Sequence, residues 1–266
     1  MKPILKWAGG KTQLLHEIRE RMPETYNRYY EPFFGGGAVY FNLMPENAVV
    51  NDKNRQLINC YIQVRDNLQQ LLVELDNHTI NHNEEYYYKI REMYNSRMKN
   101  SELTYEDAGM MLYLNKAGFN GMYRENKNGY FNIPSGKKKS VMLYDSKNIH
   151  ECSEQLVNTE LRNLDFEEAC KDAQKGDFVF FDSPYYKTFD TYQAKGFTID
   201  DHERLAKLFK ELTDKGVYCM LTNSNEEYVK DLYRDYNIDV VDVRRMINWG
   251  GQKKIVQEVI ITNYEK

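Results

Sequence analysis

The chain has 266 residues, of which 41% are hydrophobic, and its formal net charge is −4. A chain of this length can form one large domain or a core with an insertion, and its apolar fraction suffices for a sizeable core. The acidic balance excludes a nucleic-acid binder that is basic over its whole surface, so any contact with nucleic acid must come from local basic segments.

The cysteines and the N-terminus bear on where the protein works. The four cysteines are far apart and lack metal-ligand spacing, so we expect reduced thiols in a cytoplasmic protein and no bound metal. They are Cys60, Cys152, Cys170 and Cys219. The first residues contain no signal-peptide core, and no apolar run is long enough to cross a membrane, so we expect no membrane contact.

The first element is a glycine turn, Lys6-Trp-Ala-Gly-Gly-Lys11, which precedes an expected helix over 12–22. Adjacent glycines permit a positive φ or a close approach of the backbone to a ligand. A turn at the start of a helix favours anions, because the first helical N–H groups have no partner within the helix. The spacing does not fit the P-loop pattern.

A strand, a glycine turn and a helix are expected next, over 29–43, and a second strand over 48–50 ends at Asn51-Asp52. An acid roughly 20 residues after such a turn is placed to bind ribose hydroxyls. The Gly-x-Gly-x-x-Gly fingerprint is absent, so the pattern favours a nucleoside cofactor without a pyrophosphate. The alternative is a glycine loop that serves packing alone.

Residues 55–145 have a different character. Helices are expected over 56–75, 83–98 and 105–114, and Asn128-Gly129 is a strong hairpin signal. Amides, aromatics, Arg124 and three consecutive lysines surround that hairpin, and such groups can contact base edges and phosphates. We therefore expect an inserted, mainly helical domain. The alternative is an ordinary helical subdomain with a polar hairpin.

The α/β pattern resumes after residue 145. A strand is expected over 159–164, and Asp165-Phe166 lie at the end of that strand. Further strands are expected over 178–181, 217–222, 238–243 and 258–262. Thr198 and Asp201 predict a capping box at the start of a helix that ends near Gly216.

The strand over 178–181 delivers Asp182-Ser183-Pro184-Tyr185 to the carboxyl edge of the sheet, where α/β proteins bind ligands. Pro184 stiffens the chain and biases Ser183 to an extended conformation. The Asp182 carboxylate and the Ser183 carbonyl would then form a rigid pair of acceptors beside an aromatic ring, which suits a flat base with an amino group. The alternative is a turn after a core strand.

Six motifs in this order resemble the Dam-type DNA adenine-N6 methyltransferases. They are Lys6-Trp-Ala-Gly-Gly-Lys11, Glu31-Pro-Phe-Phe-Gly-Gly-Gly37, Asn51-Asp52, Phe119-Asn-Gly121 with Arg124, Phe131-Asn-Ile-Pro134 and Asp182-Ser-Pro-Tyr185. The resemblance implies an α/β fold of the class I, Rossmann-like methyltransferase type, with helices on both faces of the sheet. It also implies a discontinuous catalytic domain, 1–54 and 146–266, and an inserted target-recognition domain, 55–145.

The same resemblance implies transfer of a methyl group from S-adenosylmethionine to a flipped-out adenine in double-stranded DNA, with S-adenosylhomocysteine as product. The implied cofactor site comprises Trp7, Lys11, Phe33, Gly35, Gly37, Asp52, Asp165, Phe166 and Asp182. The implied site for the target adenine comprises Asp182, Ser183, Pro184 and Tyr185. The implied DNA contacts, commonly to GATC, are Lys6, Asn120, Met122, Arg124, Pro134, Lys137 and Lys139.

Two departures from the family pattern leave alternatives open. Ser183 stands where relatives usually have proline, and Lys137 stands where they commonly have arginine. The chain could therefore be a catalytically weakened DNA-binding relative, or a methyltransferase for RNA or a small molecule. We expect a monomer from a bacterium or a phage, and its role in restriction-modification or gene regulation stays open.

Overall fold

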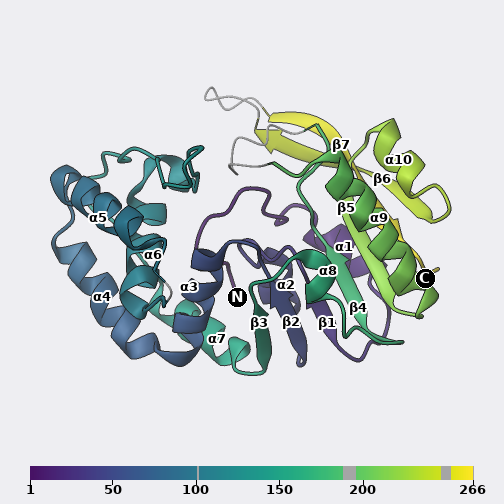
Figure 1. Ribbon diagram of the computed structural model, residues 1–266, viewed down its shortest axis with the longest axis horizontal. Helices are drawn as coiled ribbons and strands as arrows, with labels where there is room; N and C mark the ends of the chain where they lie inside the picture. The colour runs from purple at the N-terminus through teal and green to yellow at the C-terminus, as the bar shows by residue number, and fades with distance from the viewer. Residues whose placement is uncertain (101, 188–195, 247–252, 266) are drawn as a thin grey trace.

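The computed structural model describes residues 1–100, 102–187, 196–246 and 253–265 (Figure 1). Its strands form one seven-stranded sheet in the order β3-β2-β1-β4-β5-β7-β6. Their bounds are β1 Tyr29–Glu31, β2 Ala48–Asn51, β3 Thr159–Arg162, β4 Phe178–Phe181, β5 Tyr218–Ser224, β6 Asn237–Met246 and β7 Lys253–Thr262.

The first five strands of the sheet are parallel, and β7 runs antiparallel to both β5 and β6. Strands β1, β2 and β4 are buried along their whole length, as expected for central strands covered on both faces. Parallel strands bring their carboxyl ends to one edge, so Asp52 and Asp182 lie at the same edge of the sheet. This mixed α/β sheet confirms the predicted class I methyltransferase fold.

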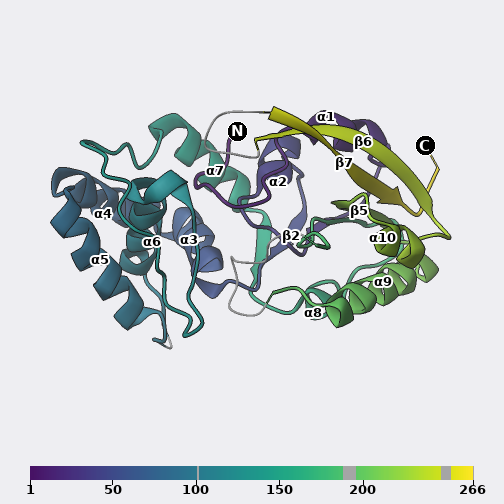
Figure 2. The same cartoon turned by 90° about the horizontal axis from the view of Figure 1, so that it is seen from above.

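Helices cover both faces of the sheet, as Figure 2 shows for α1 and α2 on one side and α8 and α9 on the other. Side chains that alternate along β4 enter two separate apolar cores, with Phe178 and Phe180 in one and Val179 and Phe181 in the other. The bounds of these helices and of two more near the sheet are α1 Leu15–Arg21, α2 Ala38–Leu43, α7 Ser146–Leu156, α8 Phe166–Ala169, α9 Ile199–Asp214 and α10 Glu227–Leu232.

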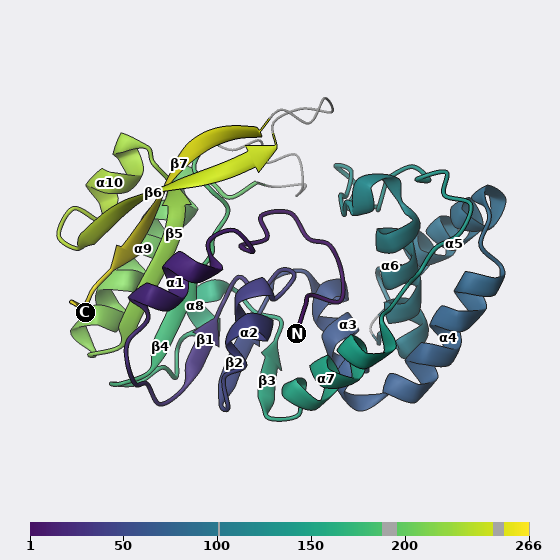
Figure 3. The ribbon, with the colours of Figure 1, turned by 180° about the vertical axis from the view of Figure 1, so that it is seen from behind.

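Four helices and a short 3₁₀ turn form a bundle beside the sheet (Figures 1 and 3). They are α3 Arg55–Asp66, α4 Leu68–Ile80, α5 Glu84–Arg97, α6 Tyr105–Ala117 and the turn Phe119–Gly121. Helix α6 is buried along nearly its whole length, because α3, α4 and α5 pack around it. Among the described residues, no strand of the sheet lies between 52 and 158. The boundaries of the inserted domain, 55–145, stay a prediction.

Some elements differ from the sequence-based expectation. The helical run over 56–75 is two helices, because the chain leaves helical geometry at Asn67, whose side chain donates to Gln63 (2.7 Å). Asp165 and Phe166 do not end a strand but begin α8, where the Asp165 side chain accepts from the Glu167 backbone N–H.

The capping box of Thr198 and Asp201 is confirmed at the start of α9. Among the described residues, no helix is long and apolar enough to cross a membrane.

Candidate functional site

The Asp182 carboxylate lies directly after β4, and three neighbouring segments surround it. Its Oδ1 is 2.5 Å from Nζ of Lys11 and accepts a hydrogen bond from Thr222 Oγ1 at 2.9 Å. Phe181 pairs with Leu221 in the sheet, so the next residues along these strands, Asp182 and Thr222, are neighbours by register. Burial raises the pKa of Asp182, and the ammonium of Lys11 opposes that rise by stabilising the anion.

Lys11 contacts Asp182, Gly9 and the Tyr185 ring. Besides its ion pair with Asp182, its ammonium donates to the Gly9 carbonyl at 2.8 Å and sits 4.7 Å from the centre of the Tyr185 ring. The resemblance assigns Asp182 to both the cofactor and the target adenine, so these contacts leave the assignment of Lys11 to the cofactor a prediction.

A buried carboxylate fixes the Tyr185 ring. The hydroxyl of Tyr185 donates to Glu258 Oε2 at 2.6 Å, and only 8% and 2% of the two residues are exposed. Burial, together with the nearby Asp182 and Glu258 carboxylates, raises the pKa of Tyr185 well above its ordinary value, so it remains a donor. Sequence reasoning missed Glu258, although a single acid inside the apolar run of β7 was a usable signal.

Ser183 is buried, and its neighbour in the adjacent strand orders the turn. The side-chain amide of Asn223 donates to Ser183 Oγ at 3.4 Å, while its carbonyl oxygen accepts from the Tyr186 backbone N–H at 3.0 Å. Asn223 follows Thr222 in β5, so this strand supports both ends of the Asp182–Tyr185 segment. The sequence did not indicate these roles for Thr222 and Asn223.

Asp52 closes the glycine turn that follows β1. Its two carboxylate oxygens accept from the backbone N–H groups of Gly35 (2.9 Å) and Asn54 (2.8 Å). Gly35 has a φ of +50°, and a Cβ there would lie 2.8 Å from the Trp7 ring. Trp7, Gly35 and Asp52 therefore meet, as the resemblance implies for one cofactor site.

Gly37 is required by packing within the protein. Its φ is +66°, and a Cβ would lie 2.7 Å from the Phe34 ring. Packing thus accounts for a glycine at this position, and the role of Gly37 in cofactor binding stays a prediction.

Three phenylalanines from separate segments form an aromatic cluster between β1 and α9. The ring of Phe33 lies 5.4 Å from Phe166 and 5.8 Å from Phe197. Arg204 bonds Asp165 at 2.7 Å and covers the Phe166 ring at 4.8 Å. The structure thus joins the predicted Phe33, Phe166 and Asp165 and adds Phe197, which the sequence did not single out.

The predicted DNA-contacting residues fall on segments around the end of α6. Asn115 in α6 accepts from the Lys6 backbone N–H (3.0 Å) and donates to the carbonyls of Lys6 and Gly121 (2.9 and 3.1 Å). The Phe119 N–H donates to the Pro134 carbonyl at 3.0 Å. The segments that hold Lys6, Asn120, Met122 and Pro134 are therefore brought together.

The hairpin that holds Arg124 is built on an isolated bridge between Glu125 and Phe131. Arg124 Nε donates to Asn132 Oδ1 at 2.9 Å, which orients the guanidinium across the hairpin. Lys137 and Lys139 follow the hairpin and are exposed.

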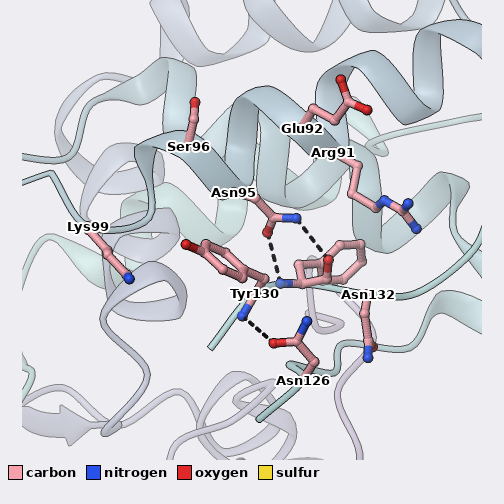
Figure 4. Close-up of a pocket in the computed structure, with 9 residues that line it drawn as sticks. Arg91, Glu92, Asn95, Ser96, Lys99, Asn126, Tyr130 and Asn132 are labelled. Carbon is pink, nitrogen blue, oxygen red and sulfur yellow. Dashed lines mark hydrogen bonds between the residues drawn. The ribbon is translucent and has the colours of Figure 1, made fainter. Parts of the chain in front are cut away.

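A surface hollow of about 620 Å³ lies between α5 and the hairpin (Figure 4). Its lining residues are Arg91, Glu92, Asn95, Ser96, Lys99, Asn126, Tyr130, Phe131 and Asn132. Asn95 exchanges two hydrogen bonds with the backbone of Phe131 (2.8 and 3.0 Å), so the hollow marks where the hairpin is anchored to α5. It does not include the Asp182 site.

Comparison with known families matches residues 7–247 to the D12 class N6 adenine-specific DNA methyltransferases. The chain belongs to this family. It is 41% identical to the type II methyltransferase M1.LlaDCHI of Lactococcus lactis subsp. cremoris, over 99% of this chain and 96% of that protein. It is 36% identical to the type II methyltransferase M.MjaIII of Methanocaldococcus jannaschii, over 99% of each chain.

A third relative is the DNA adenine methylase of Escherichia coli K12, 30% identical over 97% of this chain and 94% of that one. The predicted family and enzyme class are thus confirmed: the protein is a DNA adenine-N6 methyltransferase.

Proposed function

We propose that this methyltransferase uses S-adenosylmethionine to methylate a flipped-out adenine in double-stranded DNA, with GATC as the preferred site. The observation that carries the proposal is the Asp182 carboxylate at the end of β4, beside a Tyr185 ring that Glu258 holds in place. We further propose a monomeric, cytoplasmic protein whose residues 55–145 recognise DNA and whose residues 1–54 and 146–266 carry out catalysis.

The residues at the other end of the site fit this cofactor. Asp52 offers carboxylate oxygens as acceptors for ribose hydroxyls, and the cluster of Phe33, Phe166 and Phe197 offers aromatic faces for an adenine ring. When bound, the cofactor supplies a methyl group activated by a sulfonium. Residues of this chain do the rest.

The Asp182 carboxylate and the Ser183 carbonyl are the proposed acceptors for the two N–H groups of the target amine. Positive charge develops on that nitrogen during transfer, so a fixed carboxylate stabilises the transition state more than the ground state. Lys11 and Thr222 both donate to Asp182 Oδ1, and a carboxylate can accept about four hydrogen bonds, so the amine can bond to Asp182 without displacing either donor. Stacking on Tyr185, worth about 1–3 kcal/mol, offsets part of the few kcal/mol needed to unstack the base.

Arg124 and Lys137 are the proposed readers of guanine. A bidentate arginine–guanine contact discriminates by about 1–3 kcal/mol. Lysine lacks the planar fork of arginine, so Lys137 should discriminate less strictly between bases. We therefore expect some methylation of sites that differ from GATC at one outer base pair. Arg124→Ala should relax specificity. Lys139→Ala, if Lys139 meets only phosphate, should weaken binding to all sequences and reduce the salt slope by about one.

The direct test supplies tritiated S-adenosylmethionine and unmethylated duplex DNA to the purified protein and identifies the labelled nucleoside. We expect N6-methyladenine, without a metal requirement, and sequencing of DNA from a methylation-free host should show it mainly in GATC. Methylcytosine, or activity that a chelator abolishes, would contradict the chemistry. DNA binding without transfer would favour the weakened relative, and a dominant motif other than GATC would overturn the specificity alone.

A further inference from the structure

His82 lies in the turn between α4 and α5, and its ring bridges two otherwise separate segments. Its Nδ1 is 2.8 Å from the hydroxyl of Tyr113 in α6, and its Nε2 is 3.0 Å from the backbone carbonyl of Lys138. A carbonyl can only accept, so Nε2 carries the proton, and Nδ1 then accepts from the Tyr113 hydroxyl. This network therefore defines the tautomer of His82.

The side of the bridge at Tyr113 is rigid. Tyr113 is fully buried in α6, the central helix of the bundle, and the His82 ring packs edge-on against it at 5.7 Å. His82 therefore connects the buried core of the bundle to the surface segment that holds Lys138.

The other side of the bridge is the lysine loop, which we define as Ser135–Lys139. Further hydrogen bonds hold it: the Gly136 N–H donates to the Ala117 carbonyl at 3.0 Å, and the Lys137 N–H donates to Ser135 Oγ at 3.1 Å. The Lys138 ammonium also donates to the Lys116 carbonyl. The contacts of Gly136 and Lys138 fasten the loop to the end of α6, the contact between Lys137 and Ser135 lies within the loop, and His82 holds the backbone carbonyl just after Lys137.

Lys137 itself has an unusual conformation. Its φ is +52°, in the left-handed region that residues other than glycine adopt when surrounding contacts impose it. The Ser135 hydroxyl holds the backbone before the Lys137 Cα, and His82 holds the carbonyl one residue beyond it. Loss of either contact should release this residue toward ordinary backbone angles.

We propose that His82 is a positioning residue that sets the lysine loop for contact with DNA. The proposal rests on the proposed function, in which Lys137 and Lys139 contact DNA. A lysine is a point charge on a flexible stem, so the place of its ammonium depends on where the backbone holds the stem. The tether runs from Tyr113 through His82 to the Lys138 carbonyl, and thus to the lysines on either side.

The first experiment needs no DNA. Hydrogen exchange of the backbone amides of Gly136 and Lys137 is measured in the wild type, in His82→Phe and in a control, His150→Phe. The phenylalanine at 82 keeps an aromatic ring but removes both hydrogen-bonding atoms, and His150 lies in α7, where its ring contacts the Ser146 carbonyl. We expect exchange about tenfold faster in His82→Phe and unchanged in His150→Phe.

The second experiment separates positioning from a general loss of structure. In His82→Phe, binding to a GATC duplex should weaken about fivefold, and discrimination against a duplex altered at one outer base pair should fall. The single-turnover rate at saturating DNA and the affinity for S-adenosylmethionine should stay within twofold of the wild type. His82→Gln, whose amide can still donate to the Lys138 carbonyl, should recover part of the binding.

Tyr113→Phe provides an independent variant should His82→Phe not fold. It leaves the bond from His82 to Lys138 but removes the hydroxyl that fixes Nδ1, so we expect an intermediate loss of DNA binding. The proposal is overturned if the Gly136 and Lys137 amides of His82→Phe exchange at the wild-type rate. It is also overturned if these amides exchange faster while DNA affinity and discrimination stay at the wild-type level. A wild-type protein that does not act on DNA refutes the proposed function, while the exchange experiment still decides whether His82 holds the loop.

Discussion

Removal of the Tyr185 hydroxyl should separate the two roles of that side chain. Tyr185→Phe keeps the aromatic ring available to the target base but deletes the 2.6 Å hydrogen bond to the Glu258 carboxylate. A hydrogen bond to a charged group contributes about 1.5–3 kcal/mol. Because Glu258 is 2% exposed, water cannot readily replace the lost donor, and we expect the free energy of unfolding to fall by roughly that amount.

The expected thermal shift follows from the size of the chain. At roughly 2–4 °C per kcal/mol for chains of about this length, Tyr185→Phe should lower Tm by about 3–12 °C. Base stacking is retained, so the single-turnover rate of methyl transfer should fall by less than about tenfold, or ~1.4 kcal/mol of barrier.

Tyr144→Phe is the matched control. It removes a hydroxyl that donates to the exposed Asp76 carboxylate at 2.8 Å, where water can take its place, so we expect a change below about 1 kcal/mol. Urea unfolding and single-turnover transfer are measured on both variants. If Tyr185→Phe proves as stable as Tyr144→Phe, our account of Glu258 is wrong. If it also loses transfer activity, the hydroxyl acts in the reaction.

Other substitutions test further parts of the site. Asp182→Ala should lower turnover by orders of magnitude with near-normal cofactor affinity, and Asp52→Ala should mainly weaken cofactor binding, as equilibrium binding and single-turnover rates will distinguish. Ser183→Ala should keep activity within about tenfold, because its carbonyl is the proposed acceptor, and a greater loss of the measured rate would give the hydroxyl a role. Burial raises the pKa of Glu31 to about 8, so between the ordinary carboxyl range and pH 8 the folded state binds more protons than the unfolded state, and stability falls as pH rises. Glu31→Gln should remove this slope, at most about 1.4 kcal/mol per pH unit, in urea unfolding at pH 6 and pH 8.

Local sequence signals were sufficient to predict most of the sheet. The run Phe178–Phe181 predicts a buried parallel strand because each residue is apolar, and the acid that follows marks the ligand edge. Helices α8 and α10 escaped prediction for a physical reason. Helices α8 and α10 have 4 and 6 residues, too few for an apolar face to repeat at helical spacing.

The contacts within the site were harder to predict, because they depend on strand order. The sequence places Asp182 at the end of a strand, but it does not place β5 beside β4 or insert β7 between β5 and β6. Only that order sets Thr222 next to Asp182 and Ser224 opposite Glu258. Asp182 and Thr222 are 40 positions apart in the sequence, and Tyr185 and Glu258 are 73 positions apart, yet both pairs meet at one edge of the sheet.

The strand order also explains how a buried acid can serve this site. Burial raises the pKa of Asp182 and the nearby Glu258 carboxylate adds to that rise, whereas the Lys11 ammonium and the Thr222 hydroxyl oppose it. Lys11 and Thr222 provide donors to Asp182, and Tyr185 provides one to Glu258. Because Tyr185 stands between the two acids, the same side chain stabilises Glu258 and presents its ring beside Asp182. In the proposed reaction the target amine would add a donor to Asp182 and leave the bond between Tyr185 and Glu258 intact.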